Sequence, residues 1–128
     1  MISLGLLVWP NPAHAQPADE SLAGRIQRLT TLLHSNQLIA ARPLIAQVRG
    51  EVPPEMVPNL DFYLALSYVF EYYEKHNTAA LATAAAQFEA FISTYPKHDL
   101  VALARYNLAD VHAIKQDFAQ ALQLYVPL

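Results

Sequence analysis

The 128-residue sequence contains no cysteine, three glycines and one tryptophan, and few of its residues are charged. The absence of cysteine excludes disulfides, thiolate metal ligands and cysteine nucleophiles. Charged residues make up 15% of the chain and hydrophobic residues 54%, which is not the balance of a disordered segment. Scarce glycine with abundant alanine and leucine favours helices.

The charge distribution gives no sign of a nucleic-acid partner. Eight basic residues stand against eleven acidic ones, for a net charge of −3, and they form no basic stripe. The length is that of one domain of ordinary size. We therefore expect a single folded domain with no nucleic-acid partner.

The first 15 residues have the pattern of an export signal. An apolar run at 2–9 is broken by Pro10 and followed by Ala-His-Ala at 13–15, the small-residue pattern that signal peptidases accept. The run is far shorter than the roughly 20 apolar residues that span a bilayer. We predict a signal peptide at 1–15, cleaved after Ala15, and a mature domain at 16–128 without a membrane span. The alternative is a disordered apolar N-terminus.

The predicted signal lacks the usual basic front end, because no Lys or Arg precedes Arg25. We therefore expect the natural start of the chain to lie further upstream. The signal places the mature domain in the periplasm or outside the cell.

Helical periodicity begins near Glu20, where Leu22, Ile26, Leu29 and Leu33 recur at spacings of three and four. Polar turns and prolines divide the rest of the chain, and Asn77-Thr78 and Asp99 are residue types that cap helix starts. Helices are expected at about 20–34, 37–49, 58–76, 78–95 and 100–115, and from 118 to at least 125.

The helices are expected to pair into three hairpins, and the last hairpin carries the clearest motif. Leu108-Ala109 and His112 occupy the first helix, and Ala121 and Tyr125 the second. Alanines at such points let two helices cross closely, since a larger side chain would push them apart. The other hairpins supply similar residues: Leu66, Ser67, Phe70, Ala84, Phe88 and Pro96 in the middle one, and Leu29, Leu32, Ala41, Ile45 and Pro53 in the first.

This pattern resembles the tetratricopeptide (TPR) family over residues 20–128, although Arg25 and Arg28 stand where apolar residues are usual. The alanines at 41, 84 and 121 are 43 and 37 residues apart, more than the family's roughly 34. The run Phe88, Phe91, Tyr95, Pro96 is similar to the TPR domains of bacterial periplasmic and cell-envelope proteins.

The resemblance implies an all-α fold: a right-handed α-α superhelix, or TPR-like solenoid, of about three hairpins, with the signal outside it. The chain ends at Leu128 without a capping helix, so we expect a domain truncated at its C-terminus or one whose open end meets a partner. The implied function is a non-catalytic scaffold that binds a protein or peptide in the cell envelope, with a part in envelope assembly or coordination. The alternative is a structural or oligomerisation arm of a longer protein, such as an outer-membrane protein.

In TPR superhelices the first helix of each hairpin lines the binding groove. The residues that the resemblance places there are Tyr68, Glu71, Tyr72, Tyr106 and Asp110. Tyrosine is a residue type that interfaces favour. The alternative is that the tyrosines only fill the core between the helices, which is the expectation for Tyr63 and Tyr73.

No residue pattern indicates catalysis, a cofactor or a metal. The five histidines form no pair at metal-ligand spacing, and His112 replaces a tyrosine of the repeat. We interpret the charged residues Glu71, Glu74 and Lys75 as solvent-exposed surface. Glu71 and Lys75 are expected to form an ordinary ion pair four residues apart on a helix. The sequence therefore predicts neither an enzyme nor a cofactor-binding protein.

Overall fold

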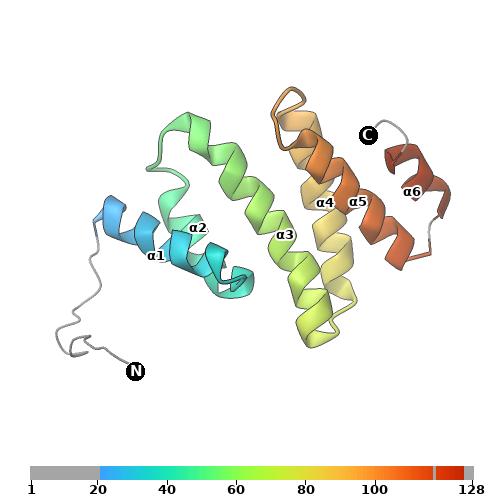
Figure 1. Ribbon diagram of the computed structural model, residues 1–128, viewed down its shortest axis with the longest axis horizontal. Coiled ribbons are helices and arrows are strands. Elements are labelled where there is room, and N and C mark those ends of the chain that lie inside the picture. Colours follow the sequence, from blue (N-terminus) through green and yellow to red (C-terminus); the bar gives the residue numbers. More distant parts are fainter. Residues whose placement is uncertain (1–20, 117, 126–128) are drawn as a thin grey trace.

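The computed structural model describes residues 21–116 and 118–125, without the side chains of residues 118, 119 and 121. Within this part every regular element is a helix and no strand occurs, so the all-α prediction is confirmed there. Six α-helices follow one another, and each begins and ends within two residues of its predicted position (Figure 1). They are α1 (Leu22–His34), α2 (Leu38–Val48), α3 (Val57–Lys75), α4 (Ala79–Thr94), α5 (Val101–Ile114) and α6 (Phe118–Tyr125), and a short 3-10 helix, η1 (Pro54–Met56), precedes α3.

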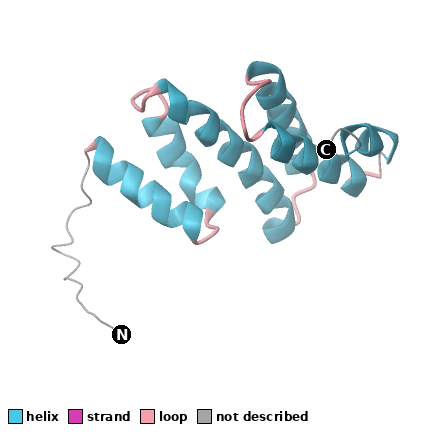
Figure 2. Ribbon diagram, turned by 45° about the horizontal axis from the view of Figure 1, so that its top comes forward, coloured by secondary structure: helices cyan, strands magenta, loops and turns pink. Residues whose placement is uncertain are grey.

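The helices pack in chain order. Each one contacts the next, and α3 also touches α5, so the helices stand side by side along one direction (Figures 1 and 2). The short turns make α1 with α2, α3 with α4, and α5 with α6 into helical hairpins. The predicted signal at 1–15 lies outside the described residues and stays a prediction. Among the described residues, no helix is both long enough and apolar enough to cross a membrane.

Each hairpin turn contains one residue in the left-handed region of backbone space. These residues are Asn36, His76 and Gln116, with φ of 59°, 54° and 65°. The intervals from Asn36 to His76 and from His76 to Gln116 are both 40 residues. Such a conformation ends a helix and reverses the chain. The backbone therefore changes direction at a regular interval, although glycine, its usual residue, occupies none of the three positions.

Side chains accept hydrogen bonds from backbone N–H groups at the starts of α1, α4 and α5, but not always the side chains expected. The Ser21 hydroxyl accepts a 3.0 Å hydrogen bond from the Gly24 N–H at the start of α1. At α4 the Asn77 side chain accepts from the Ala79 N–H at 3.1 Å, while Thr78 makes no capping bond. The expectation that Asp99 caps α5 is wrong. There Nδ1 of His98 accepts from the Leu100 N–H at 3.0 Å, because the turn presents the imidazole instead of the carboxylate.

The core consists of two hydrophobic clusters joined through α3. The first lies among α1, α2 and the start of α3, and the second among α3, α4 and α5. Phe62 lies edge-on to Phe88 and Phe91 in the second cluster, with ring centroids 5.7 and 5.9 Å apart. Tyr63 packs against both clusters, as predicted for a core tyrosine.

The small residues expected at helix crossings are buried wherever the structure describes their side chains. Ala41, Ala84, Ser67 and Ala109 are all completely buried. Their burial fits the expectation that a larger side chain would separate the helices. The side chain of Ala121 lies outside the described residues, so its expected place at the third crossing stays a prediction.

Candidate functional site

The five residues predicted to line a groove fall into two groups on two helices. Tyr68, Glu71 and Tyr72 lie on α3, and Tyr106 and Asp110 lie on α5. No hydrogen bond, ion pair or ring contact within the described chain links one group to the other. The members of each group thus share one helix, and the two groups stay separate although α3 and α5 touch.

The group on α3 is organised by Arg42 of α2. The guanidinium carbon of Arg42 lies 3.8 Å from the centroid of the Tyr68 ring, a cation–π contact. Its Nη2 forms an ion pair of 2.8 Å with Glu71. Its Nε donates a 2.8 Å hydrogen bond to the buried hydroxyl of Ser67. One arginine therefore holds α2 against two turns of α3.

Glu71 joins helices and is not part of a local surface pair. Its carboxylate pairs with Arg42 of α2, and not with Lys75 as the four-residue spacing led us to expect. The other carboxylate oxygen accepts a 2.5 Å hydrogen bond from the Asn77 side chain. The hydrogen bond from Arg42, followed by that from Asn77, lowers the pKa of Glu71 below its usual value. Glu71 therefore stays ionised at neutral pH, and its partners are already part of the fold.

The two consecutive tyrosines of α3 have different surroundings. Tyr72 is half-buried and packs against the second cluster. Tyr73 is 61% exposed, so its predicted core role is wrong. Successive helical residues point about 100° apart, and only one of the pair faces the neighbouring helices. The ring of Tyr73 lies edge-on to that of Tyr72, with centroids 5.1 Å apart.

The group on α5 is completed by Tyr125 of α6. The Tyr125 hydroxyl donates a 2.5 Å hydrogen bond to Asp110, and its ring lies 5.7 Å from the ring of Tyr106. The hydrogen bond to Asp110 raises the pKa of Tyr125 to about 12. Tyr106 and Leu103 remain 48% exposed, and they are neighbours on one face of α5 because they are three residues apart. Leu103 and Tyr106 thus form an exposed strip on α5, beside the hydrogen bond between Tyr125 and Asp110.

Sequence reasoning missed a second polar junction, at Asp61 of α3. Its carboxylate accepts hydrogen bonds from Arg49 at 2.7 and 3.0 Å and from the Tyr95 hydroxyl at 2.7 Å. Burial alone would raise the pKa of Asp61, but the bonds from Arg49 and Tyr95 outweigh it and hold that pKa below its usual 3.8. The only signal in the sequence is an acidic residue in the otherwise uncharged first half of α3.

An apolar slot of about 210 Å³ opens between α1 and α3. Ile26, Leu29 and Leu33 of α1 form one wall, and Leu60 and Tyr63 of α3 form the other. Sequence reasoning assigned the leucines to a packed stripe and gave no sign of the slot. It forms because α1 and α3 stand apart while both pack on α2.

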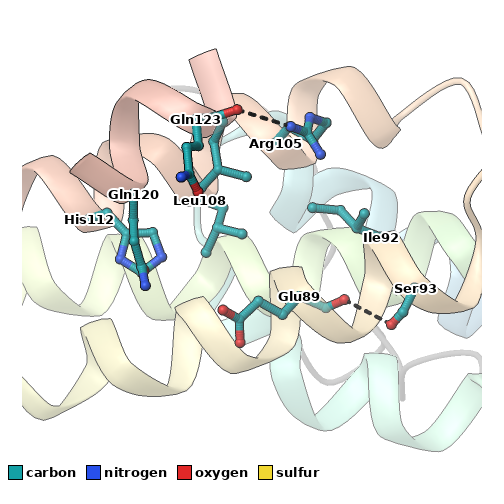
Figure 3. Close-up of a pocket in the computed structure, with 9 residues that line it drawn as sticks. Glu89, Ile92, Ser93, Arg105, Leu108, His112, Gln120 and Gln123 are labelled. Atoms are coloured by element: carbon teal, nitrogen blue, oxygen red, sulfur yellow. Dashed lines mark hydrogen bonds between the residues drawn. The ribbon is translucent and has the colours of Figure 1, made fainter. Parts of the chain in front are cut away.

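A larger pocket of about 460 Å³ lies among α4, α5 and α6 (Figure 3). It has charged and polar residues at its edges, with Arg105 and His112 from α5 and Glu89 from α4. Apolar side chains, among them Ile92 and Leu108, form the wall between them. His112, which the TPR resemblance predicted to replace a repeat tyrosine, is buried at 6% exposure.

The described part of the chain holds no group of three or more His, Cys, Asp or Glu residues placed to bind a metal ion. Glu74 and Lys75 are exposed, at the end of α3. No family model, curated protein or solved structure matches this chain in the comparisons.

Proposed function

We propose that this chain is a TPR-like, non-catalytic scaffold of the bacterial periplasm or cell envelope that binds a protein or peptide partner. The observation that carries the proposal is the strip formed by Leu103 and Tyr106 on α5. Each is 48% exposed, and the ring of Tyr106 is braced by Tyr125. Tyrosines held in place by neighbours lose little conformational freedom on binding, which is why interfaces favour them.

Three further features support a repeat scaffold. The helices pack in chain order, the hairpin turns are 40 residues apart, and small residues are buried at the crossings. Repeat proteins are built from units that contact mainly their neighbours. Both intervals exceed the roughly 34 residues of the TPR pattern. The long α3 and the loop before it lengthen the first interval, and the 16-residue α4 with the loop after it lengthens the second.

Partner capture is tested by site-specific photo-crosslinking in bacteria that express the chain. A photo-crosslinking amino acid replaces Tyr106 in one variant and Tyr72 in another. The control replaces Ala82, which is exposed on α4. The proposal predicts a crosslinked partner from positions 106 and 72 but not from 82. Crosslinks from position 82 alone, or from none of the three positions, contradict it.

Export is tested separately, by fractionating cells that express the full chain with a C-terminal tag. A mature protein beginning at Gln16 in the periplasmic fraction is the expected result. An uncleaved chain in the cytoplasmic fraction would overturn the proposed location and leave the binding surface to be judged by crosslinking.

A second candidate function is a structural or oligomerisation arm. The observation that favours it is the exposure of Leu122, 62% exposed on α6, in addition to that of Leu103 and Tyr106 on α5. Sedimentation velocity at several protein concentrations separates the two functions. A dimer or higher oligomer that Leu122→Ser dissociates favours the arm, whereas a concentration-independent monomer rules it out for this chain.

A further inference from the structure

The pocket among α4, α5 and α6 holds two opposite charges that do not pair with each other. Arg105 of α5 and Glu89 of α4 both line it. The Nε of Arg105 is buried without a hydrogen-bond partner, and its Nη2 donates only a long bond of 3.4 Å to the Gln123 backbone carbonyl. The Arg105 guanidinium therefore forms no strong hydrogen bond within the described chain.

The junction one hairpin earlier shows what paired charges look like in the same arrangement of helices. There Arg49 comes at the end of α2 and Asp61 lies on α3, and the two form an ion pair of 2.7 Å that the Tyr95 hydroxyl completes. In the pocket among α4, α5 and α6 the order is reversed: the acidic residue, Glu89, lies on α4, and the basic residue, Arg105, lies on the next helix, α5. About 460 Å³ of space remains among α4, α5 and α6, within the range of small-molecule sites.

The two charges stand toward opposite ends of this pocket. Figure 3 shows Arg105 on the side where Gln123 and Ile92 lie, and the Glu89 carboxylate directed toward the end where His112 lies. Arg105 and His112 are seven residues apart, about 10 Å along the helix axis. Three extended peptide residues span a similar length.

We propose that this pocket binds a short peptide of about three residues with free termini, its carboxylate at Arg105 and its ammonium group at Glu89. The guanidinium presents two parallel donors to a carboxylate, a geometry that favours bidentate binding. Ile92, Leu108 and Leu124 contact the middle of the peptide through apolar surface, so its side chains are small or apolar. This site is separate from the strip on α5, and either proposal can fail without the other.

The test is titration of the isotope-labelled protein with tri-alanine, followed by NMR of the methyl groups of Ile92, Leu108 and Leu124. Tri-alanine at millimolar concentration should shift these signals. Its N-acetylated and C-amidated forms each lack one terminal charge, and each should bind at least about tenfold more weakly, since a charge-assisted hydrogen bond accounts for a factor of this size. Free alanine, too short to reach both charges, should also bind more weakly.

Two substitutions assign the ends of the peptide. Arg105→Gln should remove the preference for a free carboxylate, and Glu89→Gln should remove the preference for a free ammonium group. Lys97→Gln and Glu74→Gln, two exposed charges outside the pocket, serve as matched controls and should leave binding unchanged. Circular dichroism checks folding. If Arg105→Gln fails to fold, Glu89→Gln, at an exposed residue, and the blocked peptides still test the proposal. Absence of shifts with tri-alanine, or equal binding of the blocked forms, overturns the proposal.

Discussion

The Tyr95 hydroxyl, just after α4, donates a hydrogen bond of 2.7 Å to the carboxylate of Asp61, which lies 34 residues earlier on α3. The same carboxylate pairs with Arg49, just after α2. Three successive helices thus meet at one acidic side chain. This junction lies at the edge of the second hydrophobic cluster, against which Tyr95 packs, and it fixes how one hairpin sits on the next.

Asp61→Asn is expected to lower the free energy of unfolding by about 1–2 kcal/mol, because it weakens charge-assisted hydrogen bonds that are partly screened by solvent. Urea denaturation followed by circular dichroism measures it. Asp99→Asn is the matched control: Asp99 is exposed and caps no helix, so its change should stay within about 0.5 kcal/mol. Equal effects of the two substitutions would mean that the junction does not stabilise the fold.

Tyr125→Phe is expected to change how stability depends on alkaline pH. Asp110 raises the pKa of Tyr125 in the folded chain to about 12, from its ordinary 10.0. The stabilisation is therefore fully present below pH 10 and is lost as the pH rises toward 12. The melting temperature of the natural chain should exceed that of the variant by a constant amount below pH 10, and the difference should shrink above it. A difference that is the same at pH 7 and pH 11.5 would contradict the hydrogen bond to Asp110.

Asn77→Ala is expected to destabilise the protein by about 0.5–2 kcal/mol, because the Asn77 side chain caps α4. It also removes the bond from Asn77 to Glu71. Thr78→Ala, one residue later, removes no capping bond and should have a much smaller effect. Thermal unfolding of the two variants side by side provides the measurement. A larger loss for Thr78→Ala would show that the turn is capped differently.

Ala84→Leu is expected to cost about 1–3 kcal/mol, because Ala84 is completely buried and a larger side chain must push helices apart. Ala86→Leu on the same helix is the control, since Ala86 is exposed. Both substitutions introduce the same residue with the same helix preference. The comparison of their denaturant midpoints therefore isolates packing, and equal midpoints would argue against a tight crossing at Ala84.

Local features of the sequence were sufficient to place the helices. The leucine stripe of α1 and the polar residues of the hairpin turns are short-range signals, and the helix bounds followed from them within two residues. The sequence did not determine which side chain bonds to the backbone at the start of a helix. Asp99 and His98 are adjacent, and only the path of the turn decides which of them meets the Leu100 N–H.

Contacts between helices were beyond sequence reasoning. Arg42 lies 25 residues before Ser67 and 29 before Glu71, and nothing in either segment indicates that they meet. The exposure of Tyr73 depends on the angle at which α3 packs on its neighbours, a property of the whole assembly. The residues proposed for the groove lie on α3 and α5, within the helices expected from the sequence, while their hydrogen-bond partners became visible only in the structure.

Two hydrophobic clusters share α3 as a common wall, and this division has a consequence for how the molecule opens. Separating α1 and α2 from the rest removes one cluster and leaves the other, between α3 and α5, with most of its own contacts. Amide hydrogens in the first hairpin can then exchange with solvent through a partial opening, without complete unfolding. We therefore expect a partly open state in which α3, α4 and α5 are still ordered.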